Sequence, residues 1–250
     1  RKTKNFFTYH KLVSRMNYEQ LLDEIMVNTV SAQELIWLPQ RDLRYGVCPG
    51  VLEFHTSLFL ASALLAFDQH KPIIFLVQVE ELPGDAMVYT GQIWPHFGRV
   101  WNQNSEDLSA VRKLQLEETD QNFYPYLDKL FAYLAVINIH QEHVVIFVKT
   151  GAKICSLLEH IKPLLEQWYS LMVMNDCYAG LSCKEKTAQL IASCKHQSMT
   201  EKQQYEYPAL ACLSSLLAQR QGNQEIEHLI NTGDLGLDEE RSTSLWFMIV

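Results

Sequence analysis

Cys48, His143 and Glu159 are three residues whose types and order fit nucleophilic catalysis. Cys48 stands in the segment GVCPG, between two glycines and directly before a proline. A thiolate at the start of a helix is stabilised by free N–H groups and by the helix dipole, so its pKa falls. Such a nucleophile needs a histidine as general base and a third group that orients the histidine. We therefore expect Cys48 as nucleophile, His143 as base and Glu159 as orienting acid.

Neighbouring residues offer alternatives for two of these roles. His140 is an alternative base, and Asn175 or Asp176 is an alternative orienting group. The N–H of Cys48 is a candidate donor to an oxyanion, because the flanking glycines let the backbone approach a substrate carbonyl.

The elements that must position this triad are a helix and a β-hairpin. Pro49 and the apolar run that follows it predict a buried helix over 49–67, with Cys48 at its start. The run VVIFV predicts a strand over 143–148, and KTGAK predicts a turn in which Gly151 takes a positive φ. A return strand over 153–159 would then bring Glu159 opposite His143.

A rival interpretation replaces the return strand with a helix. The segment from Ile154 to Met174 has its leucines and isoleucines at helical spacing, with Pro163 as a kink. The hairpin interpretation instead starts a new helix near Pro163, where a proline suits the first turn. We expect the hairpin, because KTGAK is a compact turn with Gly151 available for a positive φ and because Pro163 fits the first turn of a new helix.

The C-terminal part of the sequence differs from the rest. A polar stretch covers 180–206. After it, the sequence is similar to the two helices of an ankyrin repeat: the first would begin at Pro208, and the second would be NQEIEHLINTGDLGL. The segment STSLWFMI then restarts the pattern. A plain helical hairpin is the alternative. We expect an α+β domain over 1–195 and an ankyrin-like helical segment over 196–250, truncated before further repeats.

The segment around Cys48 resembles the G-x-C-x-G nucleophile segment of YopT/AvrPphB-type papain-like cysteine protease effectors. The order of cysteine, histidine and acid is similar too. The resemblance implies a papain-like fold with a buried N-terminal helix and an antiparallel sheet, and the roles already given to Cys48, His143 and Glu159. It also implies a thiol protease or acyl transferase that acts on a protein, as a bacterial effector secreted into a host cell. Gln40 is a weak counterpart of the oxyanion-hole side chain.

Composition narrows the classes of function. The formal net charge of −8 argues against nucleic acid as a partner, because binding to phosphates needs a basic surface. The six cysteines form no C-x-x-C pair, so we expect reduced thiols in the cytoplasm, without metal or cofactor. No apolar run is long enough to predict a membrane span. The alternative to an enzyme is a non-catalytic protein-binding platform, an inactive protease-like scaffold that recruits its partner through the ankyrin-like segment.

Overall fold

The structure is a computed structural model that describes residues 18–35, 43–53, 56–67, 71–91, 113–137, 143–167, 169–175, 181, 183–195, 199–219, 225–231 and 244–249. The helices are α2 (Tyr18–Leu35), α3 (Ser57–Ala66), α5 (Leu127–Ile137), α6 (Ile154–Leu165), α7 (Cys183–Lys195), α8 (Glu201–Glu206) and α9 (Pro208–Ala218). The strands are β1 (Tyr45–Cys48), β2 (Ile73–Val79), β3 (Ala86–Tyr89), β4 (Glu117–Thr119), β5 (Val144–Lys149), β6 (Ser170–Met174), β7 (Glu225–Asn231) and β8 (Ser244–Ile249).

All eight strands belong to one mixed sheet in the order β4-β3-β5-β2-β6-β1-β8-β7. The four central strands β5, β2, β6 and β1 run parallel, whereas β3 and β8 pair with them antiparallel on either side. A mixed helix-and-strand fold is therefore confirmed, but the expected antiparallel sheet is not. The central strands are buried almost throughout, which is typical of a parallel sheet covered on both faces.

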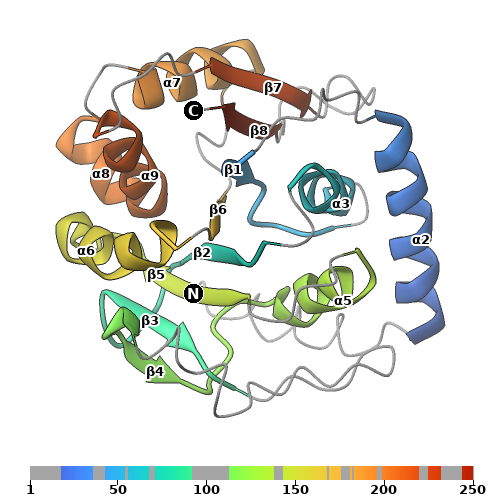
Figure 1. Ribbon diagram of the computed structural model, residues 1–250, viewed down its shortest axis with the longest axis horizontal. Coiled ribbons are helices and arrows are strands. Elements are labelled where there is room, and N and C mark those ends of the chain that lie inside the picture. Colours follow the sequence, from blue (N-terminus) through green and yellow to red (C-terminus); the bar gives the residue numbers. More distant parts are fainter. Residues whose placement is uncertain are drawn as a thin grey trace, which may run out of the picture.

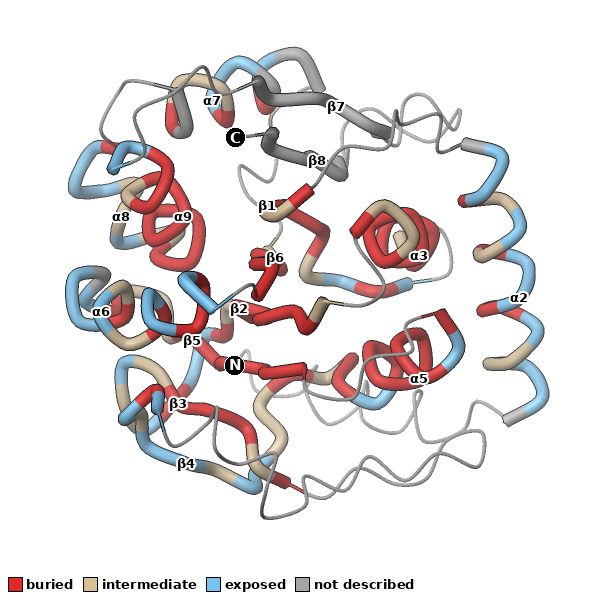
Figure 2. The backbone as a smooth tube through the Cα atoms, viewed as in Figure 1, coloured by how far each residue is buried: buried red, intermediate tan, exposed pale blue. Residues whose placement is uncertain are grey.

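Helices cover the two faces of the sheet (Figure 1). The first face packs against α2, α3 and α5, and the second against α6, α7 and α9. Neighbouring strand residues alternate between the two cores: Phe75 belongs to the first and Leu76 to the second. Figure 2 shows that burial is concentrated in the central strands and in the sides of the helices that face them.

The predicted hairpin after β5 is wrong. Gly151 does make the turn, with a φ of 84°, but the chain then enters α6 instead of a return strand. Leu157, Ile161 and Leu164 lie on one face of this helix and are buried against the second face of the sheet. The rival helix is right about the start at Ile154 and wrong about the end, because 170–174 form β6.

The expected ankyrin-like segment over 196–250 is also wrong. The helix that starts at Pro208 is present as α9, with the proline in its first turn. The segments 225–231 and 244–249, however, are strands β7 and β8, and β8 pairs with β1 of the expected N-terminal domain. The chain from both sides of residue 195 therefore contributes to one sheet.

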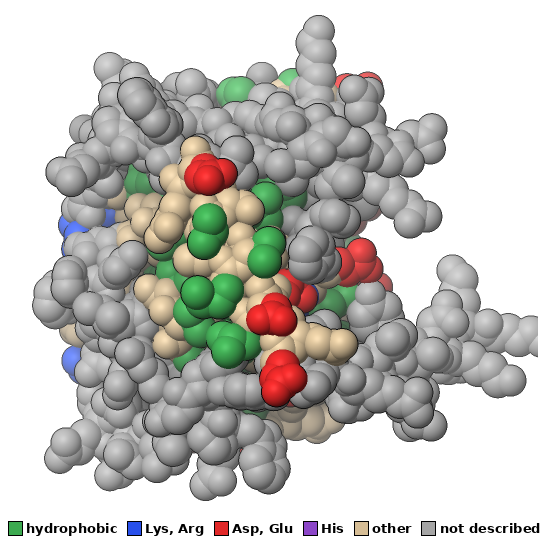
Figure 3. All heavy atoms as spheres, turned by 90° about the vertical axis from the view of Figure 1, so that its right-hand side faces the viewer, with side chains coloured by type: hydrophobic (Ala, Val, Ile, Leu, Met, Phe, Trp, Pro, Cys, Tyr) green, Lys and Arg blue, Asp and Glu red, His purple; other side chains and the backbone are tan. Residues whose placement is uncertain are grey.

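Helix α2 lies at the outside of the first face. It buries Ile25 and Ala32 against the core, while its outer side carries Met26, Val27 and Val30, each about half exposed. Figure 3 looks onto this side and shows an apolar patch with acidic side chains at both ends. None of the described helices is long and apolar enough to cross a membrane.

Candidate ligand site at the carboxyl edge of the parallel strands

Cys48 is the last residue of β1 and not the first of a helix. The next helix, α3, begins only at Ser57. The prediction failed because the residue before a proline is driven to an extended conformation; Cys48 stays in the strand and pairs with Met174 of β6. The loop that follows is closed by Thr56, whose Oγ1 accepts a bond from the N–H of Glu53 at 2.8 Å and donates to the carbonyl of Val51 at 2.6 Å.

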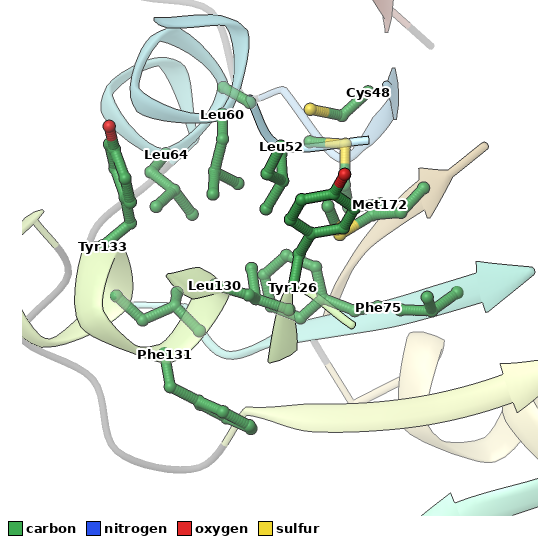
Figure 4. Packing of buried hydrophobic residues seen from close by; sticks show 14 of the residues in the cluster. Cys48, Leu52, Leu60, Leu64, Phe75, Tyr126, Leu130, Phe131, Tyr133 and Met172 are labelled. Carbon is green, nitrogen blue, oxygen red and sulfur yellow. The ribbon is translucent and has the colours of Figure 1, made fainter. Parts of the chain in front are cut away.

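The thiol of Cys48 lies in the first core. Cys48 is fully buried and belongs to the same cluster as Leu52, Tyr126 and Met172. In Figure 4 its sulfur points into this cluster. Among the described residues no helix begins at Cys48, so the thiol lacks the helix N-terminus that was expected to activate it.

His143 lies at the amino end of the parallel strands, whereas Cys48 lies at their carboxyl end. His143 directly precedes β5, and its Nδ1 accepts a bond from the N–H of Ile73 at 3.1 Å. The register pairs Cys48 with Met174, and through Val77 both lie level with Phe147, four residues beyond the histidine. The Cα atoms of Cys48 and His143 are therefore separated by four residues along the strand direction and by three strand spacings across the sheet. Together these displacements correspond to a distance of about 20 Å. The structure therefore does not bring nucleophile and base together.

Glu159 does not complete a triad either. It is an exposed residue of α6, and this helix covers the second face of the sheet, whereas the Cys48 side chain lies on the first. Asn175, the alternative orienting group, does lie beside Cys48: its backbone N–H donates to the Cys48 carbonyl at 3.0 Å. His140, Asp176 and Gln40 lie outside the described residues.

A chain of hydrogen-bonded side chains runs along the carboxyl edge of the parallel strands. Asn175, directly after β6, donates from Nδ2 to Oε1 of Gln78 in β2 at 2.6 Å. Gln78 in turn donates from Nε2 to the Glu206 carbonyl at 2.6 Å and to Oγ1 of Thr150, directly after β5, at 3.2 Å. Gln78, Thr150 and Asn175 are half-buried, so this edge is polar and only partly covered.

Sequence reasoning missed this constellation, although a signal for it exists. Gln78, Thr150 and Asn175 each interrupt or follow an apolar strand, in IIFLVQV, VVIFVKT and SLMVMN. Because the carboxyl ends of parallel strands meet at one edge of a sheet, polar residues at those ends come together. The predicted hairpin made β5 part of an antiparallel pair, so the sequence analysis did not place these three residues at a common end of parallel strands.

Buried side chains from the first face fix the loop after β1. The Tyr124 hydroxyl donates to the Gly50 carbonyl at 2.7 Å, and Nζ of Lys129 donates to the Leu52 carbonyl at 2.9 Å. Lys129 also forms an ion pair with Glu24 of α2, at 2.6 Å, and both side chains are buried. The loop after β1 is thus held by Tyr124 and by Lys129 of α5, and Lys129 is itself paired with Glu24 of α2.

Two further hydrogen bonds extend this buried network. Tyr133 of α5 donates its hydroxyl to Oε1 of Glu24 at 3.1 Å and accepts from Nδ2 of Asn28 at 2.8 Å. Burial lowers the pKa of Lys129, an effect that its hydrogen bond to Glu24 opposes, and burial raises the pKa of Tyr133. Each buried polar group here has a partner, so the network orders α2, α5 and the loop relative to one another.

The connections from β1 and β6 leave the sheet in opposite directions. The chain after β1 leads to α3 on the first face, and the chain after β6 leads to α7 and α9 on the second. In open α/β sheets, neighbouring strands whose connections diverge in this way flank a crevice at their carboxyl ends, where ligands bind. Cys48 and Asn175 are the residues at these two strand ends. Among the described residues, no group of three potential ligands is placed to hold a metal ion.

Comparisons with known proteins give a similar structure and no family. No family model matches the sequence, and none of the curated proteins is similar to it. The crystal structure of the uncharacterized protein JW3007 from Escherichia coli K12 is similar over 83% of this chain and 100% of that chain, with 12% sequence identity and a TM-score of 0.49.

Proposed function

We propose that the protein binds a small polar molecule at the carboxyl edge of the sheet, between β1 and β6. The observation that carries this proposal is the divergence of the two connections, to α3 on one face and to α7 on the other. The polar side chains of Gln78, Thr150 and Asn175 lie at the same carboxyl ends of the strands, which supports this location for the site.

The residues at this edge are held in fixed positions before any ligand arrives. Gln78 orients the Asn175 amide, and Lys129 and Tyr124 hold the loop after Cys48. A site fixed by its surroundings binds with a smaller loss of conformational entropy. Side-chain amides both donate and accept hydrogen bonds, so the expected ligand presents neutral donors and acceptors more than a strong charge.

Cysteine-dependent hydrolysis of a protein substrate stays a prediction. Cys48 lies at the proposed edge, but His143 lies about 20 Å away, and Glu159 lies beyond the other face. A nucleophilic role for Cys48 therefore needs a base other than His143. Ligand binding does not depend on such a base.

A cavity elsewhere offers a rival place for a ligand. It has a volume of about 300 Å³ and lies between the edge formed by β3 and β4 and the start of α6. Asp85, Glu117, Lys153, Ser156 and His160 are among the residues that line it. The cavity is separated from β1 and β6 by the width of β5 and β2, so variants can distinguish the two places.

A thermal-shift screen with small polar metabolites tests the proposal. A ligand present at one hundred times its Kd stabilises the fold by about 2.7 kcal/mol, which raises Tm by about 5–10 °C for a chain of this size. We expect the shift to disappear in Asn175→Ala and to persist in the matched control His160→Ala. A shift that persists in Asn175→Ala and disappears in His160→Ala would place the ligand in the cavity beside α6 and contradict the proposal.

A further inference from the structure

We propose that the outer side of α2 is a docking surface for a basic amphipathic helix of another protein. Met26, Val27 and Val30 are 51%, 54% and 52% exposed. These three residues lie within about one and a half helical turns and project from one side of α2, so they form one contiguous apolar patch.

The inner side of α2 packs against the core of the described structure, and the outer patch lies on the opposite side of the helix. Ile25 and Ala32 face the core, and Glu24 and Asn28 take part in the buried network with Lys129 and Tyr133. A helix with apolar residues on two sides is typical of an element packed between two partners. The protein itself supplies only the inner one in the described structure.

Acidic residues close the patch at both ends. At 100° per residue, Glu19, Asp23 and Glu34 project from the same side of α2 as the apolar residues, and all three are exposed. Asp23 and Glu34 lie about 17 Å apart along the axis. Figure 3 shows this arrangement, with the apolar side chains between acidic ones. The complementary partner is a helix with apolar residues in its middle and Lys or Arg at both ends.

The same charges argue against a second copy of this chain on the patch. Helix α2 contains no Lys or Arg. In an antiparallel pair of α2 helices, Glu34 of one copy would meet Glu19 and Asp23 of the other, and in a parallel pair each acid would meet its own counterpart. Like charges in such positions are repulsive.

Two synthetic helical peptides test the proposal with the full 250-residue chain. Both carry the same apolar stripe of leucines; one has lysines at both ends, and the other has glutamates there. Fluorescence anisotropy should show that the lysine peptide binds at least about tenfold more tightly, because two or three ion pairs form at the rim of the patch. Raising the salt concentration from about 0.05 M to 0.5 M should reduce this difference.

Variants of α2 locate the contact. Val27→Asp combined with Val30→Asp should abolish binding, whereas the matched control Val136→Asp, at an exposed position of α5, should leave it unchanged. Asp23→Lys combined with Glu34→Lys should reverse the preference toward the glutamate peptide. Equal affinity for the two peptides, or binding that survives Val27→Asp with Val30→Asp, would contradict the proposal. So would a dimer of the chain that these aspartates dissociate.

Discussion

Replacing Lys129 with methionine should destabilise the protein by about 3–5 kcal/mol, because the Glu24 carboxylate then stays buried without its cation. Both side chains of this ion pair are only 6% exposed, and Nζ lies 2.6 Å from Oε1. The substitution also removes the donor to the Leu52 carbonyl. For a chain of this size, the loss corresponds to a fall in Tm of about 6–20 °C.

A double-mutant cycle separates the ion pair from the packing of Lys129. Glu24→Gln keeps an oxygen that can accept from the Tyr133 hydroxyl. We expect the double variant Glu24→Gln with Lys129→Met to be more stable than the sum of the single effects predicts, by about 2–3 kcal/mol. The matched control is Lys202→Met, which breaks an exposed pair with Glu206 at 3.7 Å and should cost less than about 1 kcal/mol.

Urea unfolding followed by circular dichroism measures these free energies. The reasoning would be refuted if Lys129→Met changed the free energy of unfolding no more than Lys202→Met does. It would also be refuted by strictly additive single effects, since additivity means that Glu24 and Lys129 do not interact.

Three further predictions concern the cysteines and the turn after β5. Iodoacetamide at neutral pH should modify exposed Cys155 well ahead of buried Cys48 and Cys212, as peptide mass spectrometry can show; faster modification of Cys48 would restore the case for an activated nucleophile. Burial raises the pKa of Cys212 from 9.0 to about 12, so its contribution to stability is present below pH 9 and is lost as the pH rises toward 12, by up to about 4 kcal/mol. Cys212→Ala should flatten the fall in Tm over this range, and an unchanged slope would show that Cys212 does not cause it. Gly151→Ala should lower the free energy of unfolding by more than about 1 kcal/mol, because φ is 84° and the new Cβ would lie 2.7 Å from Cε2 of Tyr205. The control is Gly84→Ala, which should change stability less, because the φ of Gly84 is not positive and a Cβ there would lie 3.3 Å from the Glu117 side chain. Equal stability of Gly151→Ala and the wild type would contradict this account.

The sequence predicts the parts of this fold that depend on neighbouring residues. The β-branched run before Lys149 predicts β5, the glycine of KTGAK predicts the turn, and Pro208 marks the start of α9. In each case a local preference and the final structure agree. The helical spacing of Leu157 and Ile161 predicts α6 as well, but the compact turn at Gly151 and the position of Pro163 favoured a return strand.

The parts that failed depend on contacts between distant segments. The residues SLMVM, with leucine and methionines, suit a helix by propensity, and only burial on both faces of a sheet makes them β6. Tyr45 to Cys48 form a strand because they pair with 171–174, more than a hundred residues away. The same pairing decides the candidate site: it joins Cys48 to Asn175 and separates it from His143.

Methyl NMR of methionine-labelled protein tests the central claim most directly. Met174 ends β6 beside Cys48 and Asn175. Met87 of β3 pairs with Glu117, which lines the rival cavity, and Met26 lies on the outer side of α2. On titration with a small polar ligand found by thermal shift, the account predicts that the Met174 methyl signal moves while those of Met87 and Met26 stay in place. A shift of Met87 with an unmoved Met174 would contradict a ligand site between β1 and β6.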